Sequence, residues 1–548
     1  MATPSEAIAC DTGLADRLRL VLPKDIPFTL HHVSTPPRKT DALYSAPPNE
    51  RPDRTYCENH FLTVSIDLPQ SAVPSQNGNT PQNSSEPNKQ VVVLGIEIFI
   101  YTTAHSTTLF VSKADSTGYL PLLNLPKGTP SPIREVCAAF VDYLVAVRRR
   151  PDIPFIVSLF ARSQGQYLFP GSVDHGAKHV LDDRGLIKWW CRVLDPLITS
   201  PPSGRDSWKN AKGYLVIPGL DAYETRAFIP RTAAAASSWS LTHPLERISH
   251  YTREFDWVPP RCLIPRFPDD PKSRFRDELD EEAGRSGPMK TSGSWKTVKT
   301  LDMFWEMMAY RQECSSGRMT GFIWVVFDDK TPQTDQDQST VTPETPKKQR
   351  NGAVMAPNTT PRKLFPSKTD KSDKQPKKKS EKKKIKLKGP IKPRQPQAKT
   401  AQRNHFLKVP VHSPYYYWPQ DGRGSRIVNE TMYKRITELM LHLDFSSKDK
   451  AVTSSRRWTK EVGQGGDWGV RVVGAREPTL TAVEGAEGAE VNNLSGLVKR
   501  KRADTSGDGV NVLGAGLVKK KAKDEAESQP GVNVLTAGLV RKKPKAEE

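Results

Sequence analysis

Two stretches rich in large apolar side chains are separated by a long segment that contains few of them. Residues 328–404 are rich in Thr, Pro, Gln and Lys and include the string KKKSEKKKIKLKGPIKPR. Such a segment cannot bury enough apolar area to offset the entropy lost on ordering the chain. We therefore expect residues 328–404 to form a disordered, Lys-rich insert. Residues 1–327 would form the first part of a folded core, and residues 405–475 would fold back to complete it.

The stretch before the insert alternates between strand and helix patterns. Gln90–Thr103 and Thr108–Asp115 are β-prone runs joined by a short turn, which predicts a hairpin. Helical spacing predicts helices over residues 133–147, 184–198, 301–314 and 433–445, and apolar runs predict strands over residues 155–161, 212–219 and 320–327, with an extended aromatic segment at 411–428. This mixture predicts a single α/β domain with a mixed central sheet flanked by helices.

Charge is distributed unevenly along the chain. The formal net charge is +21, yet residues Pro346 to Arg403 hold 20 Lys and Arg against 3 Asp and Glu, and residues Val491 to Glu548 hold 12 against 7. The rest of the chain is therefore close to neutral. The basic segments, rather than the core, suit an acidic partner such as DNA, an acidic chaperone or a nuclear import receptor.

Residues 476–548 are predicted to form a disordered tail that contains three related segments. Val491–Arg502, Val510–Lys523 and Val532–Lys545 each combine a short apolar strip with Gly-Leu-Val and a basic cluster. Each is too short to be a domain. They are interpreted either as basic clusters for nuclear localisation or as short linear motifs that dock on a partner surface.

Several classes of protein lack their usual signals here. The six cysteines are scattered without a CxxC pair, so neither a zinc ribbon nor a disulfide framework is indicated. The N-terminus has no apolar core of signal-peptide length, and no apolar run approaches the roughly 18 residues of a membrane span. We expect an intracellular, reducing compartment and no membrane partner.

Common enzyme motifs are also missing from the sequence. It contains no Walker A, HExxH, GxSxG or kinase signature. The common acetyltransferase phosphate loop, Arg/Gln-x-x-Gly-x-Gly/Ala, is not matched either, because the nearest string, PQDGRGS, places Gln420 one residue too late.

Two stretches could form a binding site but also have ordinary structural interpretations. FVSKADSTGY (Phe110–Tyr119) is a strand that ends in a turn, where free backbone N–H groups could hold an anion. Its alternative is an Asx turn at Asp115. Ser158–Trp190 is dense in aromatic residues and holds the tandem Trp189 and Trp190. These rings indicate either core packing or an aromatic wall that excludes water from a channel.

The third stretch, RFPDDPKSRF (Arg266–Phe275), places Asp269 and Asp270 side by side between two prolines. Adjacent carboxylates repel one another, which raises the pKa of one of them. One interpretation is a solvated turn that leads into a helix near Lys272, whose N-terminal dipole favours the acids. Another is a pair of ligands for a divalent metal ion.

Taken together, these strings resemble a known family. SKAD-x-x-GY, QYLFP, KH, KWW, FPDDPK-x-RF, FW and RQE occur in the order and spacing of the fungal histone acetyltransferase that modifies histone H3. That family is similar in fold to the CREB-binding-protein acetyltransferases. The resemblance implies acetyl-CoA as co-substrate, a lysine acceptor on histone H3 (with histone H4), and no metal. It also implies delivery by histone chaperones, a nuclear location and roles in chromatin assembly and genome stability. Weak DNA contact would come from the basic tails.

The resemblance also assigns site residues. The cofactor would lie against residues of the SKAD strand, the following loop and the KWW helix, namely Ala114, Asp115, Ser116, Phe160, Gln164, His179, Val180, Leu181 and Trp189. Its phosphates would meet a helix start formed by Pro130, Ser131, Pro132, Ile133 and Arg134. Tyr167 and Trp190 would line the tunnel for the incoming lysine.

The same resemblance gives the acid pair a chemical role. A lysine amine has a pKa near 10.4, so only about one in 10³ is neutral at pH 7. Asp270 would accept its proton once the site is dehydrated, with Asp269 as supporter and Asp115 as a nearby third carboxylate. Lys272 resembles the family's self-acetylated lysine, and its modification should change its pairing with these acids. Positioning of acceptor against thioester would supply much of the rate.

The sequence departs from the family in two places. Where some members have a long loop after the first helix, this chain has only RRRPDIP (Arg148–Pro154), so a partner surface built there would be reduced. Gln164 stands where some relatives have a small residue. The residues alone leave two other classes open: a non-enzymatic chromatin adaptor that binds DNA and histone chaperones through its basic tails, and a metal-dependent phosphoryl transferase.

Overall fold

The computed structural model describes residues 13–68, 89–199, 208–284, 293–315, 317–329 and 409–478. The predicted insert beyond residue 329 and the three tail repeats lie outside the described residues. The proposed boundaries at 327, 404 and 475 therefore stay predictions.

The described residues form five successive strands after a first helix, and then a mixture of helices and strands. The strands are β1 (Pro27–Ser34), β2 (Arg38–Thr40), β3 (Thr55–Asp67), β4 (Gln90–Thr102), β5 (Thr107–Ser116), β6 (Phe155–Ala161), β7 (Asn210–Val216), β8 (Trp239–Ser240), β9 (Gly321–Asp328), β10 (Arg426–Ile427) and β11 (Val470–Val473). The helices are α1 (Leu14–Val21), α2 (Pro132–Val147), α3 (Asp183–Thr199), α4 (Ala222–Arg226), α5 (Ala233–Ser238), α6 (Leu245–Ile248), α7 (Tyr251–Glu254), α8 (Pro271–Gly284), α10 (Leu301–Ala309), α11 (Glu430–Leu441) and α12 (Lys448–Gly463).

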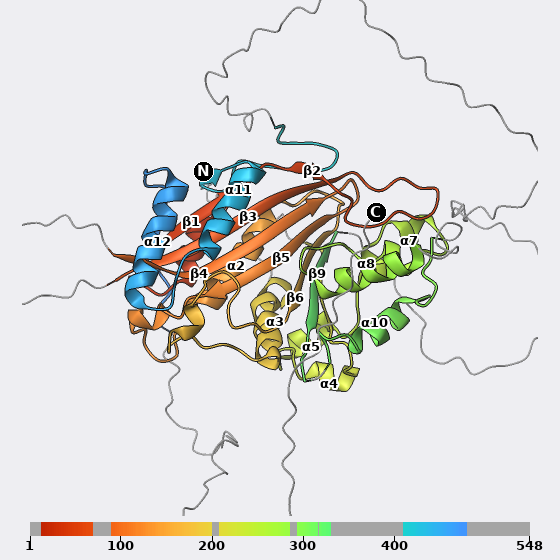
Figure 1. The fold of residues 1–548 in the computed structure, drawn as a ribbon, viewed down its shortest axis with the longest axis horizontal. Coiled ribbons are helices and arrows are strands. Elements are labelled where there is room, and N and C mark those ends of the chain that lie inside the picture. The colour runs from red at the N-terminus through yellow and green to blue at the C-terminus, as the bar shows by residue number, and fades with distance from the viewer. Residues whose placement is uncertain are drawn as a thin grey trace, which may run out of the picture. The chain divides into compact units, whose positions relative to one another are not determined.

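All of these strands join one mixed sheet. Its order is β10-β1-β3-β4-β5-β6-β9-β7-β8, with β11 also on β1 and β2 on β3. β5 pairs with β6 in parallel, whereas β3, β4 and β5 form an antiparallel meander. In Figure 1, α11 and α12 lie across the end of the sheet formed by β1, β3 and β4, and α8 and α10 lie at the other end beside β9. The predicted α/β class and flanked central sheet are confirmed.

Strand β9 shows why this sheet must be covered on both faces. Its residues are apolar in succession, and period-2 geometry sends neighbours to opposite faces. Phe322 and Trp324 belong to the apolar cluster of α8 and α10, whereas Ile323 and Val325 belong to the larger core that also contains α2 and α3 side chains. The site described below lies near the first of these faces.

The segment after residue 408 returns to the sheet. β10 pairs in parallel and β11 antiparallel with β1, at different positions along the same edge. α12 packs on β4, where the Val92 N–H donates to Ser455 Oγ over 2.9 Å. A buried ion pair adds a second attachment: Arg148 Nε lies 2.5 Å from Glu58, and its Nη2 donates to the Gly422 carbonyl over 2.8 Å.

Sequence patterns predicted most central elements but erred elsewhere. The predicted helix at 301–314 ends instead at Ala309, where Tyr310 caps it and the chain continues in turns. Strands β1 and β3 were not predicted, because polar residues such as His32, Glu58 and His60 interrupt their apolar pattern. Helix α12 was missed because its buried face includes small residues, Ala451 and Ser455 among them.

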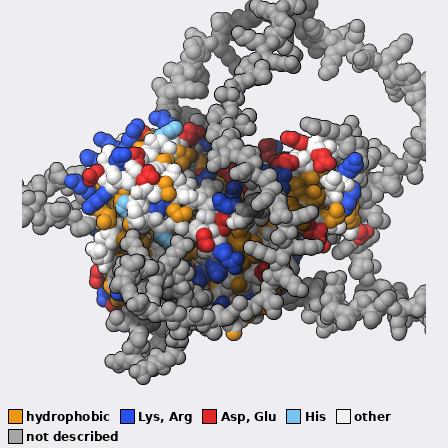
Figure 2. Space-filling model, turned by 60° about the horizontal axis from the view of Figure 1, so that its bottom comes forward, with side chains coloured by type: hydrophobic (Ala, Val, Ile, Leu, Met, Phe, Trp, Pro, Cys, Tyr) orange, Lys and Arg blue, Asp and Glu red, His pale blue; other side chains and the backbone are white. Residues whose placement is uncertain are grey.

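The surface of the described residues carries charges of both signs. In Figure 2, Lys and Arg side chains are interspersed with acidic ones, and basic groups are frequent at the end that bears α11 and α12. No helix within the described residues has the length and hydropathy needed to span a bilayer.

Candidate active site

The end of strand β5 is held by one carboxylate. Asp115 Oδ2 accepts hydrogen bonds from the backbone N–H groups of Tyr167 (2.7 Å), Leu168 (2.9 Å) and Phe169 (3.4 Å). Its Oδ1 accepts from the Ser116 N–H over 2.8 Å. Asp115 therefore fastens the loop after β6 to the end of β5. A catalytic part for Asp115 stays a prediction.

A lysine completes this anchor. Lys178 Nζ lies 3.0 Å from Asp115 Oδ1, and both side chains are buried, with 4% and 6% of their surface exposed. The loop approaches closely at Gly118, where a Cβ atom would lie 2.7 Å from the Lys178 Cα and where φ is +87°. Only glycine adopts this backbone at low cost, so the GY of the SKAD-x-x-GY string has a steric reason.

The predicted tunnel residues lie in and beside the core. Trp190 is buried, and Trp189 packs against it edge-on with ring centroids 4.9 Å apart. The Tyr167 hydroxyl donates to the Arg162 carbonyl, and burial is the main cause that raises the Tyr167 pKa to about 12. Phe160 is half-buried and stacks on Phe110 at 6.3 Å. A tunnel between these rings stays a prediction.

The acid pair is split by its own backbone. Asp269 has φ of +57°, which turns the chain so that its side chain stays 66% exposed, whereas the Asp270 side chain is fully buried. Asp270 precedes Pro271, the first residue of α8, and its Oδ1 accepts from the Lys272 N–H over 3.0 Å. This is the bond of a helix N-cap. The sequence correctly placed a helix start here.

Asp270 and Lys272 form a buried ion pair. The Lys272 ammonium contacts Asp270 Oδ2, and neither side chain has exposed surface. Three aromatic rings face the ammonium, with centroids 5.1 Å (Phe267), 5.3 Å (Phe322) and 5.9 Å (Trp324) from Nζ. Burial raises the pKa of Asp270 and lowers that of Lys272, and each partner's charge opposes the shift of the other. Desolvation, rather than repulsion from Asp269, is the first cause of the raised carboxyl pKa.

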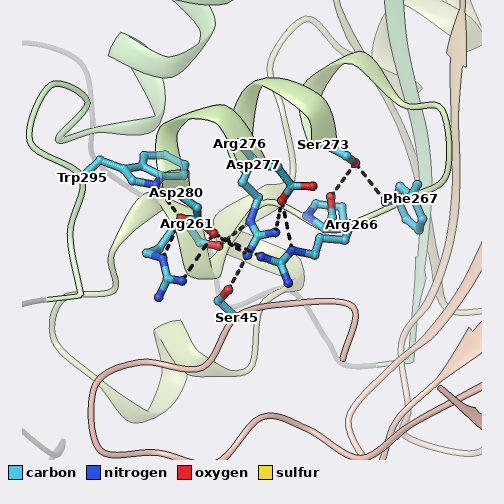
Figure 3. A network of polar contacts seen from close by, with 10 residues as sticks. Ser45, Arg261, Arg266, Phe267, Ser273, Arg276, Asp277, Asp280 and Trp295 are labelled. Carbon is cyan, nitrogen blue, oxygen red and sulfur yellow. Dashed lines mark hydrogen bonds and ion pairs between the residues drawn. The ribbon is translucent and has the colours of Figure 1, made fainter. Parts of the chain in front are cut away.

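Figure 3 shows the polar network that connects the start of this segment to α8. Arg266 lies 3.2 Å from both Asp277 and Asp280, and Arg261 lies 3.1 Å from Asp280. Arg276 has no exposed side-chain surface and lies 3.3 Å from Asp277. Three arginines thus share two carboxylates, which fixes the start of RFPDDPKSRF on the helix that follows it.

Two further contacts set the direction of the segment. Ser273 Oγ accepts from the Phe267 N–H over 2.9 Å and donates to the Pro265 carbonyl over 3.1 Å. Burial would raise the pKa of Asp280, but hydrogen bonds from Arg261 and Trp295 outweigh it and leave that pKa below its usual value. The turn before α8 is therefore held rigidly by a charged network and by a serine bridge.

Strand β5 meets the acid pair through Lys113. Lys113 Nζ lies 3.6 Å from Asp269 and 3.4 Å from the buried Glu97. Tyr433, which follows the insert, donates its hydroxyl to Glu97 over 3.2 Å. A chain of contacts thus joins the exposed acid, the SKAD strand and helix α11.

The remaining predicted cofactor residues occupy two places. Gln164, His179 and Val180 are exposed on the loop between β6 and α3, whereas Ala114, Ser116 and Leu181 are half-buried, at the end of β5 and on the same loop. Pro130, Ser131, Pro132, Ile133 and Arg134 surround the start of α2. No side chain caps that helix start, so its first N–H groups remain open to an anion. Arg134 donates to Glu135 over 2.7 Å.

Sequence reasoning missed three residues that organise the site. Lys113 and Lys178 are the cations next to Asp269 and Asp115, and Asp183 Oδ1 accepts from the Ser163 N–H over 2.7 Å at the base of the loop. Lys113 could have been found, because its position two residues before Asp115 places both side chains on one face of the strand. The other two gain their partners from distant parts of the chain.

A groove is lined in part by Arg266, the first residue of RFPDDPKSRF. Its lining combines residues 39–54 with two arginines, namely Lys39, Thr40, Asp41, Ala42, Tyr44, Ser45, Ala46, Glu50, Pro52, Asp53, Arg54, Arg261 and Arg266. It includes neither Asp270 nor Tyr167 nor Trp190, so it is separate from the predicted lysine tunnel.

Comparison with known families identifies the class. The family model of the histone acetyltransferase KAT11-type domain matches residues 14–154 and 146–461, which is most of the described chain. These matched ranges include the SKAD strand, the KWW helix and the RFPDDPKSRF segment. The class is therefore that of histone acetyltransferases.

Individual relatives narrow this class. The chain is 36% identical to the histone acetyltransferase rtt109 of Aspergillus flavus, over 94% of its own length and 90% of that protein. It is 34% identical to the histone acetyltransferase rtt109 of Schizosaccharomyces pombe, over 43% of its own length and 56% of that protein. The crystal structure of Rtt109 from Aspergillus fumigatus matches with a TM-score of 0.60 and 36% identity, covering 85% of this chain and 100% of that chain. The protein belongs to the Rtt109 family of KAT11-type histone acetyltransferases. Membership in this family argues against the two alternatives, a non-enzymatic adaptor and a phosphoryl transferase.

Proposed function

We propose that this enzyme transfers acetyl from acetyl-CoA to a lysine of histone H3, presented with histone H4 by a histone chaperone, and that Asp270 takes up the proton of the acceptor amine. The observation that carries the chemical part is the buried Asp270–Lys272 pair. A carboxylate without exposed surface depends on its single cation, so any change to that cation changes its basicity.

Acetylation of Lys272 would alter Asp270 in a defined direction. The ammonium opposes the effect of burial on the Asp270 pKa. Acetylation removes that charge, so the Asp270 pKa would rise further and the carboxylate would become a stronger base. Its release from Lys272 would also free Oδ2 to accept a proton from an incoming amine. Self-acetylation of Lys272 would therefore activate the enzyme.

The exposed acid has a separate task. Asp269 stands at the surface beside Lys113 and presents a carboxylate 66% open to solvent. Histone tails are cationic, so Asp269 would attract the acceptor lysine toward the site. The exposed Asp269 would capture the acceptor lysine, and the buried Asp270 would deprotonate it. One carboxylate could not be both exposed for capture and buried for deprotonation.

The cofactor would lie between the end of β5 and the start of α2. Backbone groups of Ala114, Asp115 and Ser116 end the strand, and the open N–H groups of the 16-residue α2 suit phosphate oxygens. Acetyl-CoA supplies the activated acyl group. The protein's contribution is to orient the thioester against the amine.

The basic tail is assigned to partner binding. The GLV-basic repeats between residues 491 and 548 suit acidic chaperone surfaces, with nuclear import as the rival role and weak DNA contact as a further consequence of their charge. We place the enzyme in the nucleus, in chromatin assembly and genome stability. A deletion of residues 491–548 should abolish activity in a purified chaperone-dependent assay. Loss of nuclear accumulation alone, with full purified activity, would assign the repeats to import.

The decisive experiment measures transfer of labelled acetyl from acetyl-CoA to histones H3–H4 with their chaperone in EDTA. Wild type is compared with Asp270→Asn and with Glu282→Gln, an exposed acid on the same helix. Loss of a general base is expected to lower the rate by roughly 10²–10⁴, with acetyl-CoA binding retained. The control should keep wild-type activity.

Each outcome has a defined meaning. An unimpaired Asp270→Asn variant would leave RFPDDPKSRF as a structural turn. Transfer to H4 but not H3 would overturn the substrate assignment. Lys272→Arg, which keeps the cation but cannot be acetylated at the amine, should resemble an enzyme that stays unactivated.

A further inference from the structure

Three metal-ligating side chains converge outside the site described above. Asp53 lies between β2 and β3, His105 lies in the turn between β4 and β5, and His250 directly precedes α7. One carboxylate oxygen and one ring nitrogen from each histidine all lie within 4.8 Å of one another. Three separate parts of the chain bring these groups together, which local sequence patterning does not explain.

The polar groups of this cluster lack adequate partners. Asp53 Oδ2 lies 3.6 Å from His250 Nε2, which is beyond hydrogen-bond distance. Among the described residues, none donates a hydrogen bond to the Asp53 carboxylate, although its side chain is only 18% exposed. Tyr251 packs on His250 with ring centroids 4.0 Å apart. Its hydroxyl is buried and has no hydrogen-bond partner among the described residues. The cluster therefore holds a carboxylate and a buried hydroxyl that have no hydrogen-bond donor or acceptor among the described residues.

The surrounding charges point the same way. Glu254 lies close enough to act electrostatically on both Asp53 and Tyr251, and Glu50 lies close enough to act on Tyr251. Negative groups thus gather around a half-buried carboxylate that no Lys or Arg in the described residues pairs with.

The two imidazoles are already side by side. Their rings stack at 3.9 Å with planes 7° apart, so their in-plane lone pairs lie in nearly parallel planes and one ring must turn before both can bind the same ion. His105 is exposed and His250 is half-buried, and Asp53 also lines the groove described above. An ion can therefore reach the cluster from solvent.

We propose that Asp53, His105 and His250 bind one Zn²⁺ ion, with water as the fourth ligand. Two histidines and a carboxylate form a common zinc ligand set, with bonds of about 2.0–2.2 Å. Those bonds place neighbouring ligand atoms roughly 3.3 Å apart in a tetrahedron. Binding would require the side chains, above all the exposed His105, to rotate until the present separations close to that value.

The ion would have a structural effect rather than a catalytic one. It would tie the β4–β5 turn and the start of α7 to residues 41–54. That segment also contacts the network under α8, because Arg276 donates to Ser45 Oγ. Zinc binding is therefore expected to stiffen the segment that supports RFPDDPKSRF, while transfer in EDTA proceeds at ordinary temperatures.

The test uses the full chain, freed of metal with EDTA and then titrated with ZnCl₂ by calorimetry. Wild type is compared with His105→Gln and Asp53→Asn. The control is His442→Gln, which removes an exposed histidine outside the cluster. We expect the two cluster variants to bind one equivalent fewer than wild type and the control to bind the same number. Zn²⁺ should raise the melting temperature of wild type and control by a few degrees and leave the cluster variants unchanged.

Co²⁺ gives a second readout of the same site. In wild type it should produce the visible absorption of a low-symmetry, four-coordinate ion with nitrogen and oxygen ligands, and this absorption should be lost in His105→Gln. Equal stoichiometry and equal thermal shifts in all four proteins would overturn the proposal and leave the two rings as a stacking contact. Because these measurements do not depend on acetyl transfer, their failure would leave the assignment of Asp270 intact.

Discussion

The structure contains two buried carboxylate–lysine pairs, one at the end of β5 and one at the start of α8, and the two carboxylates have different hydrogen-bond donors. Asp115 has Lys178 and four backbone N–H donors. Asp270 has one backbone donor, and that donor belongs to the same Lys272 that supplies its cation. The first carboxylate is stabilised as an anion by the fold itself. The second is stabilised mainly by a side chain that chemistry can neutralise.

The comparison explains why one pair suits anchoring and the other regulation. Backbone donors cannot be modified, so the loop held by Asp115 stays in place whatever happens at Lys178. The charge of Asp270 is balanced mainly by one ammonium group, that of Lys272, which lies among three aromatic rings. Leaving a buried carboxylate without its cation costs several kcal/mol. The cost favours the protonated form, so loss of the cation raises the pKa of the carboxyl group.

The largest expected effect is on stability in Lys272→Met. This change leaves Asp270 buried and unpaired, so the free energy of unfolding at pH 7 should fall by about 3–5 kcal/mol. Urea unfolding followed by tryptophan fluorescence measures it. The double variant Asp270→Asn/Lys272→Met should recover much of the loss, and a double variant as unstable as Lys272→Met would contradict the assigned pairing.

The same variant should show an unusual pH dependence. Without the cation, the folded-state pKa of Asp270 rises further above that of an unfolded carboxyl group. A raised folded pKa gives stability that is present at low pH and lost as the pH rises through that pKa. Lowering the pH from about 7 to about 4.5 should therefore narrow the gap between Lys272→Met and wild type. A gap that is constant or that widens would show that Asp270 is not the affected group.

Lys178→Met is expected to cost less, about 1–3 kcal/mol, because four N–H donors still satisfy Asp115. Its unfolding free energy should depend little on pH between these two values. A loss as large as that of Lys272→Met would mean that the backbone donors do not provide the support inferred here.

The smallest effect on stability is expected for Asp269→Asn. Its side chain is largely exposed, so the free energy of unfolding should change by less than about 0.5 kcal/mol. Steady-state kinetics with H3–H4 should instead show a raised KM with kcat nearly unchanged. A fall in kcat alone would assign Asp269 to the chemical step rather than to capture.

The sequence predicted the central elements well because their signals are local. Residues 155–161 form a strand as expected, since an uninterrupted β-branched and aromatic run has few other solutions. The start of α8 was likewise visible in Asp-Pro. By contrast, β3 contains Glu58, which pairs with Arg148 at the end of α2, 90 residues away, and His60, which lies 3.3 Å from Glu58. Patterning cannot reveal a polar residue whose partner is so distant.

The candidate site shows the same division. The acid pair and the tandem tryptophans were found from their rarity. The structural role of the pair was only partly visible. The exposure of Asp269 follows from its left-handed backbone, and Asp270 pairs with a lysine that is enclosed by Phe322 and Trp324 on β9. The pairing of Lys272 with the acids was expected and is seen at Asp270, whereas the contact of Asp269 with Lys113 on β5 was not predicted.

The pairing of β1 has a consequence for how the chain is made. Both strands on its outer edge, β10 and β11, come from residues after 425. During synthesis this edge stays open until nearly the whole core has left the ribosome, and an open strand edge invites pairing with other chains. Until residues 426–473 have been synthesised, the edge of β1 lacks its partner strands. We therefore expect the nascent protein to need general folding chaperones that shield exposed strand edges.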